Sequence, residues 1–161
     1  MAGTAGLARQ GATLHTGTMR NDDLPPVVEL TAEESWKYLE HTAHGRLAVS
    51  VQNRPHIYPL NYVARDGRIV FRTAPGTKLA ELAVNSNVAF EADGITSDQA
   101  WSVVVTGTSR LLERSAEIEA ADALPLEPWV RTLKYQYVEI QPERITGRFF
   151  NLGREPARYD I

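Results

Sequence analysis

Two hydroxyl and two cationic side chains lie close together in the segment FRTAPGTKLAEL, residues 71–82. Arg72 and Thr73 end a strand-like run, and Thr77 and Lys78 begin a helix-like one. A helix start offers unpaired N–H groups and the positive end of its dipole, and arginine suits bidentate contact with phosphate. A lysine in the first turn is unfavourable unless an anion offsets it. This spacing indicates a phosphate-binding turn, and a helix capped by Thr77 with a solvated lysine is the alternative.

Other common chemistries find little support in the sequence. The order Gly76-Thr77-Lys78 does not fit a Walker loop, in which the lysine precedes the hydroxyl residue. The chain has no cysteine, so disulfides, thiolate catalysis and cysteine metal sites are excluded. His41 and His44 have no carboxylate cluster nearby, and capping the end of a helix suits them better. We therefore expect no metal site and no hydrolase-type triad.

Strand-like runs surround the turn and are separated by hairpin signals. They cover residues 45–51, 56–63, 68–73, 87–93, 101–112 and 135–150. Asp66-Gly67 is typical of a tight hairpin, and Pro59 indicates an edge or a bulge in its run. We expect Pro142 and Gly147 to break the last run. The short spacing, without βαβ alternation, predicts one antiparallel barrel or sandwich.

Three short helices are predicted beside these strands. The first begins with a capping box, in which Thr31 is the N-cap and Glu34 lies three residues later. Trp36 and Leu39 then share one face. The second helix starts at Thr77, and the third covers about residues 115–124. We expect them to close the ends or sides of the barrel.

Composition sets the class of protein. The 161 residues are 43% hydrophobic and 23% charged, which fits one globular domain. A net charge of -3 argues against nonspecific binding to nucleic acid. No apolar stretch reaches the roughly 18 residues of a membrane helix, and the first residues lack the apolar core of a signal peptide. We expect a flexible tail over residues 1–25, one domain over 26–161, and a cytoplasmic protein without nucleic-acid or membrane partners.

The strands also carry a family resemblance. GRLA, PHIYPLNY, DGRIVFRT, the TK helix start and NVAF follow one another between residues 45 and 93, as in the pyridoxamine 5'-phosphate oxidase-like FMN-binding split barrels. WSVVVTGTSRLLE and YVEIQPERITGRFF resemble the next and closing strands of that family. The resemblance covers about residues 30–150. It implies a mainly β fold, namely a six-stranded antiparallel split barrel of Greek-key type with short flanking helices.

The same resemblance implies a homodimer with FMN at its interface. It places the phosphate at the turn, the isoalloxazine ring beside the backbone of the second strand, and the start of the fifth strand of a partner subunit against the flavin. The implied cofactor-binding residues are Tyr58, Pro59, Leu60, Asn61, Arg72, Thr73, Thr77, Lys78, Trp101 and Ser102. No side chain is assigned to catalysis, because N5 of the flavin carries the chemistry in such proteins.

The C-terminal segment NLGREPARYDI lacks the Arg-x-His motif of true pyridoxamine phosphate oxidases, so that activity is not expected. The leading hypothesis is an FMN-dependent oxidoreductase that passes hydride or electrons to a small acceptor, such as a nitroaromatic, a quinone or dioxygen. One alternative is an F420-dependent reductase of the same fold. Another is a non-enzymatic flavin- or haem-binding module.

Two further groups of residues have open interpretations. His56 is a candidate proton donor or haem ligand, because some members linked to nitroimidazole resistance use a histidine near the flavin or bind haem. A half-exposed strand histidine is the simpler interpretation. Trp129, Tyr135 and Tyr137 alternate in a way that favours packing in the core or an interface over a nucleic-acid surface.

Overall fold

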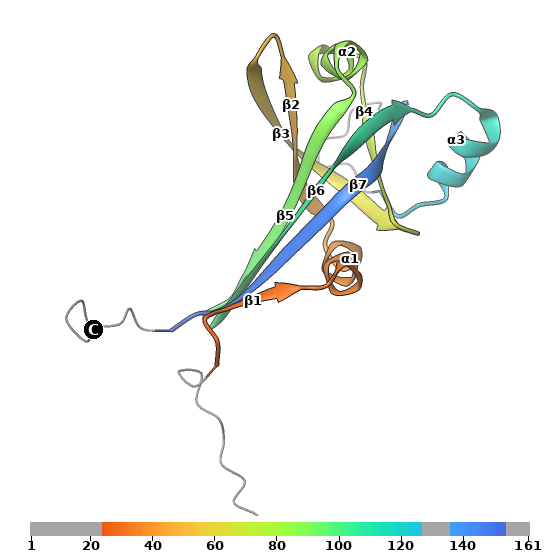
Figure 1. Cartoon of the computed structure of the whole chain (residues 1–161). Coiled ribbons are helices and arrows are strands. Elements are labelled where there is room, and N and C mark those ends of the chain that lie inside the picture. The colour runs from red at the N-terminus through yellow and green to blue at the C-terminus, as the bar shows by residue number, and fades with distance from the viewer. Residues whose placement is uncertain (1–23, 127–135, 154–161) are drawn as a thin grey trace, which may run out of the picture.

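The computed structural model describes residues 24–126 and 136–153, which form a curved antiparallel sheet with three helices against it (Figure 1). In chain order the elements are β1 (Val27–Leu30), α1 (Ala32–Glu40), β2 (His44–Val51), β3 (Arg54–Arg65), β4 (Arg68–Thr73), α2 (Thr77–Val84), β5 (Asn87–Ile95), β6 (Gln99–Leu111), α3 (Ser115–Asp122) and β7 (Gln136–Asn151). The six predicted strands correspond to β2–β7, and the predicted helices to α1–α3.

Strands β2 to β7 close into a ring. Their spatial order is β7-β4-β3-β2-β5-β6, and β6 pairs with β7 to complete it. β5 returns beside β2 instead of β4, which is Greek-key order. The additional strand β1 shares one edge of β7 with β4, since β4 pairs with residues 136–140 and β1 with residues 147–150. The predicted six-stranded split barrel is therefore confirmed, with β1 as an extra edge strand.

Alternation along the strands separates an inner from an outer face. In β4, Ile69 and Phe71 are fully buried, whereas Arg68, the first residue of the strand, is exposed. Tyr62 and Phe90 meet edge to face inside the ring, with centroids 4.7 Å apart. Burying each large apolar side chain contributes roughly 1.5–3 kcal/mol, so this interior holds the ring closed.

The last strand, β7, is continuous, so the break predicted at Pro142 and Gly147 is wrong. Pro142 instead lies opposite Gly107, where the β6–β7 register shifts between Thr106 and Gly107. A β-carbon on Gly107 would lie 2.1 Å from the backbone oxygen of Gln141. The strand accommodates its proline through a bulge, and the close approach of the two backbones at this bulge requires glycine.

Helix α1 has the predicted capping box. The Thr31 N–H donates to the Glu34 carboxylate at 2.8 Å, and the Glu34 N–H donates to the Thr31 hydroxyl at 3.2 Å. Leu39 on its inner face is fully buried, and the Tyr62 hydroxyl donates to the Leu39 carbonyl at 3.0 Å. The helix packs on β3, β6 and β7 and so covers one part of the ring (Figure 1).

Helix α3 contributes to a second, smaller apolar cluster outside the ring. Tyr137 on β7 is buried there with Leu112 and Ala121. Packing was the expected role of this tyrosine, and it is confirmed. Trp129 and Tyr135, which were grouped with it, lie outside the described residues.

Within residues 24–126 and 136–153, no helix is long and apolar enough to cross a lipid bilayer. In the same part of the chain, no three His, Cys, Asp or Glu side chains gather as a metal site would require. Most of the tail predicted over residues 1–25 lies outside the described residues.

Candidate functional site

The predicted phosphate-binding turn lies at the start of α2, where β4 ends. The N-cap is Gly76, not Thr77 as predicted, and the first helical hydrogen bond runs from Ala80 N–H to the Gly76 carbonyl at 3.0 Å. Thr77 is already helical, which is why it cannot cap the helix with its own side chain. No side chain caps α2, and its first turn contains no acidic residue. Within the described residues, the first N–H groups of this helix therefore have no capping side chain and no acidic residue in their own turn.

The two residues at the end of β4 point to opposite faces, because they are consecutive in a strand. Thr73 is 5% exposed, and its hydroxyl donates to the Ala74 carbonyl at 3.2 Å. Arg72 lies on the outer face, with its guanidinium carbon 5.4 Å from the centre of the Tyr137 ring. The structure thus does not bring Arg72 and Thr73 to one point, and Arg72 is the better placed for a ligand.

A buried amide lies next to this strand end. Gln136 faces Thr73 in the β4–β7 register. Its side-chain oxygen is buried and has no hydrogen-bond partner in the described part of the chain. Such an unsatisfied acceptor is uncommon, and a ligand hydroxyl or N–H would satisfy it. Because this oxygen is an acceptor, it suits an uncharged polar group of a ligand that donates a hydrogen bond, and not the phosphate itself.

Lys78 lies in the first turn of α2, above an aromatic ring of β3. Its ammonium nitrogen is 5.1 Å from the centre of the Tyr58 ring, which is within the range of a cation–π contact. Both residues were predicted to bind the cofactor, and the structure brings them together. The tyrosine thereby fixes the side of the helix on which the lysine lies.

A buried carboxylate that the sequence analysis missed connects α2 to β3. Glu81 is 9% exposed and contacts two side chains of β3. The Tyr58 hydroxyl donates to one carboxylate oxygen at 2.7 Å, and Nδ1 of His56 lies 2.5 Å from the other. Glu81 stands one turn after Lys78, so the helix presents both side chains on one face. That spacing was the available signal, but only the fold shows that β3 lies opposite.

This carboxylate also sets the electrostatics of the tyrosine. The hydrogen bond to Glu81 is the main cause that raises the pKa of Tyr58 above its ordinary value of 10.0. The phenol is therefore kept protonated and continues to donate to Glu81. His56 has a side chain that is 45% exposed, in accord with the simpler interpretation of a half-exposed strand histidine. It pairs with Glu81 and so belongs to the support of α2.

The rest of the predicted β3 segment lies on one edge of its hairpin. Pro59 is exposed and faces Arg46 of β2 in the register. β4 pairs with β3 only from Tyr62 onward, so the segment before it has a described strand on one side only. Pro59 thus occupies an edge, as predicted. Leu60 points into the core at 5% exposure, and Asn61 contacts His44 with its side-chain oxygen 3.1 Å from Nδ1.

The remaining predicted residues, Trp101 and Ser102, lie far from α2 within one chain. Trp101 faces Gly94 in the β5–β6 register, whereas α2 leads into the opposite end of β5 at Asn87. Seven residues of strand separate these ends by about 23 Å. Trp101 stacks on Tyr38 of α1, with ring centroids 4.8 Å apart. The structure therefore does not bring these two residues to the predicted ligands on α2 within a single chain.

Comparisons with known proteins agree with this fold. The sequence model of the family described as pyridoxamine 5'-phosphate oxidase matches residues 31–149. A solved structure from Corynebacterium glutamicum, provisionally named a pyridoxamine 5'-phosphate oxidase, is 43% identical, with a TM-score of 0.76 over 81% of this chain and 98% of its own. The FAD-binding protein of Mycobacterium smegmatis is 40% identical, with a TM-score of 0.68 over 77% of this chain and 98% of its own. The Mycobacterium tuberculosis protein Rv0080 is 35% identical and is matched over 75% of this chain and 84% of its own length. The chain therefore belongs to the pyridoxamine 5'-phosphate oxidase family.

Proposed function

We propose that the start of α2 binds the phosphate of a flavin and that the chain is a flavin-dependent oxidoreductase. The observation that carries the proposal is an uncapped helix N-terminus with Lys78 in its first turn and no acidic residue there. An anion at this point satisfies the N–H groups and offsets the unfavourable position of the lysine. The FAD-binding protein of Mycobacterium smegmatis, 40% identical to this chain, favours a flavin as the molecule that carries the phosphate.

In this proposal the residues near α2 bind and orient the cofactor. Lys78 and Arg72 supply positive charge, and the hydroxyl of Thr77 donates a hydrogen bond to the phosphate. Glu81 and Tyr58 hold the lysine on the correct side of the helix. The exposed edge of β3 around Pro59 lies beside the ring. When bound, the flavin supplies the hydride and electron transfer, so no acid–base pair of side chains is needed.

The form of the flavin follows from what the site must hold beyond the first phosphate. We propose FMN, because α2 offers one helix terminus for one phosphate. FAD brings a second phosphate and an adenosine, and F420 brings a long acidic tail, so each needs further contacts. The proposed acceptor is a small oxidant such as a nitroaromatic, a quinone or dioxygen.

Binding is tested first, with Lys78→Ala against wild type. We expect the purified full chain to show a flavin absorption band that survives desalting, and FMN to bind more tightly than FAD or F420. Loss of one charged hydrogen bond costs about 1.5–3 kcal/mol, so the variant weakens FMN binding by roughly ten- to a hundredfold. Lys37→Ala is the matched control, because Lys37 is 62% exposed on α1 and pairs with Glu33. Equal FMN affinity in Lys78→Ala and wild type would remove the phosphate site from the proposal.

Turnover is tested separately, because a flavin-binding module without activity gives the same binding result. We expect the FMN-loaded chain to oxidise NADH or NADPH in the steady state when a nitroaromatic or a quinone is added. Tight FMN binding without acceptor-dependent oxidation of NADH or NADPH would support the proposed flavin site but refute the proposed oxidoreductase activity.

A further inference from the structure

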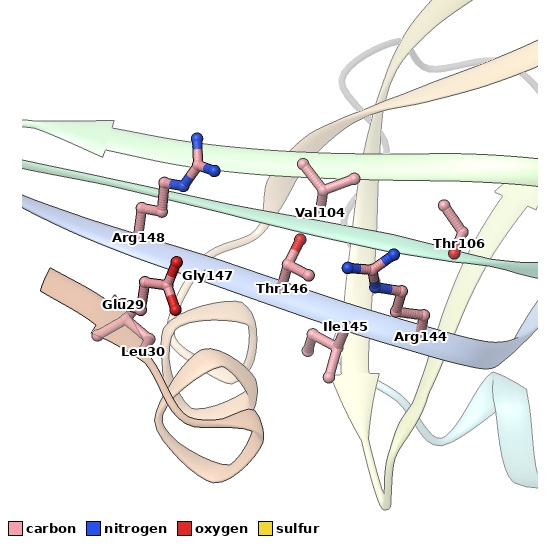
Figure 2. A pocket seen from close by; sticks show the side chains of 9 residues that line it. All are labelled: Glu29, Leu30, Val104, Thr106, Arg144, Ile145, Thr146, Gly147 and Arg148. Atoms are coloured by element: carbon pink, nitrogen blue, oxygen red, sulfur yellow. The ribbon is translucent and has the colours of Figure 1, made fainter.

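An open groove of about 450 Å³ lies where β1, β6 and β7 meet (Figure 2). Arg144, Thr146 and Arg148 alternate along β7 and so share the face that forms this groove. Val104 and Thr106 line it from β6, where they face Thr146 and Arg144 in the register. No residue of β3, β4 or α2 lines it, so within one chain it is separate from the proposed phosphate site at the start of α2.

The two arginines of the groove are exposed and have no ion-pair or hydrogen-bond partner among residues 24–126 and 136–153. Glu29 faces Arg148 in the β1–β7 register, yet they form no ion pair. Figure 2 shows the guanidinium of Arg148 extending across β6, away from that carboxylate. On β2, by contrast, Arg46 contacts Glu91 at 2.9 Å and Asp93 at 2.7 Å. The groove thus holds two cations that the neighbouring acidic residue does not engage.

We propose that this groove is a second anion-binding site, for a small molecule that carries two phosphoryl groups. Arginine donates two parallel hydrogen bonds to phosphate oxygens, and the hydroxyls of Thr106 and Thr146 add further donors between the cations. The α-carbons of Arg144 and Arg148 are about 13 Å apart along the strand, and both side chains are long enough to reach toward Thr146 between them, where adjacent phosphoryl groups would bind. Val104, 37% exposed, provides an apolar floor between the polar groups.

The test uses inorganic pyrophosphate as the probe and the full chain, with binding followed by calorimetry at moderate salt. We expect saturable binding that weakens at least roughly tenfold in the Arg144→Gln/Arg148→Gln double variant, since several charged hydrogen bonds are lost. The matched control is Arg65→Gln/Arg114→Gln, which removes the same charge at exposed positions outside the groove. Both double variants are expected to fold, because all four arginines are exposed.

Two further variants locate the site. Glu29→Gln is expected to strengthen pyrophosphate binding, because it removes the negative charge in the groove. Lys78→Ala is expected to leave it unchanged, and flavin absorbance measured on the same samples keeps this result separate from the proposed flavin function. The proposal is overturned if wild type shows no saturable binding, if the control weakens binding as much as the groove variant, or if only Lys78→Ala abolishes it. It is also overturned if the groove variant changes only the oligomeric state, because the groove is then a contact between chains.

Discussion

Replacing Glu81 by alanine tests how α2 is held in place. The variant removes a carboxylate that is 2.7 Å from the Tyr58 hydroxyl and 2.5 Å from Nδ1 of His56. A hydrogen bond to a charged acceptor contributes about 1.5–3 kcal/mol. The His56 side chain is 45% exposed, so its contact with Glu81 is discounted to about 0–1 kcal/mol. The free energy of unfolding should therefore fall by about 1.5–4 kcal/mol in Glu81→Ala.

The assay is urea unfolding of the flavin-free chain, followed by FMN binding. Glu81→Gln keeps an acceptor for the Tyr58 hydroxyl, and we expect it to lose only about 1 kcal/mol. Glu33→Ala is the matched control, because Glu33 is 81% exposed, and it should change stability by less than about 0.5 kcal/mol. FMN affinity should fall in Glu81→Ala, because Lys78 loses the fixed tyrosine beneath it. Unchanged stability in Glu81→Ala, or an equal loss in Glu33→Ala, would refute the reasoning.

The same contact predicts a dependence on pH. Glu81 raises the folded-state pKa of Tyr58 above the ordinary 10.0, so the protonated phenol is favoured by folding. This contribution to stability is fully present below pH 10.0 and is lost as the pH rises through the folded-state pKa. Glu81→Ala should lose stability less steeply than wild type over that range. Parallel curves for the two proteins would contradict the assigned cause.

Three further predictions concern the frame around the site. Gly107→Ala should destabilise the chain by roughly 2–3 kcal/mol in urea unfolding, because its β-carbon would lie 2.1 Å from a backbone oxygen. In Gly76→Ala the added β-carbon meets nothing within 4 Å, so this control variant should lose less than about 1 kcal/mol in the same assay. Thr31→Ala should cost about 1 kcal/mol by thermal or urea unfolding. The hydrogen bond from the Thr31 backbone lowers the pKa of Glu34, so its contribution should be present above the ordinary pKa of 4.5 and lost as the pH falls through the folded-state pKa. A Glu34→Gln chain that retained this acid dependence would contradict the assignment. Glu139→Ala should cost roughly 2–4 kcal/mol, because this 6%-exposed carboxylate holds two arginines, and a loss below about 1 kcal/mol would show that the pairing contributes little.

The sequence predicted the strands because alternation is a local property. Ile69 and Phe71 are buried where the pattern places them, and the Asp66-Gly67 turn follows from the residue types. β1 was not predicted, because its four residues follow two prolines and are mostly exposed, so no alternation marks them. The effect of Pro142 was also misjudged. A bulge depends on the partner strand, and only the fold shows that Gly107 lies opposite.

The sequence likewise predicted the local features of the candidate site but not the contacts between distant segments. The position of the helix start follows from a local change of period, and the structure has α2 there, one residue displaced at its cap. The family resemblance implied that Lys78 and Tyr58 bind one cofactor, but their direct contact was not predicted, because 20 residues of chain separate them. Glu81 was missed for the same reason. From the sequence alone, a carboxylate on a short helix is expected to face solvent, and only the fold shows that a strand covers it.

The distance between the two groups of predicted ligands bears on the dimer. Trp101 lies about 23 Å along β5 from the end at which α2 joins it. An FMN molecule bound through its phosphate near Lys78 cannot also touch Trp101 of the same chain unless it spans that length along the sheet. Trp101 is further held on α1 by its stack with Tyr38, and Gly94 leaves it no room to move inward, since a β-carbon there would lie 2.3 Å from the indole nitrogen. If both groups contact one flavin, the tryptophan must therefore come from a second chain. The proposed homodimer is in that case part of the proposed binding site.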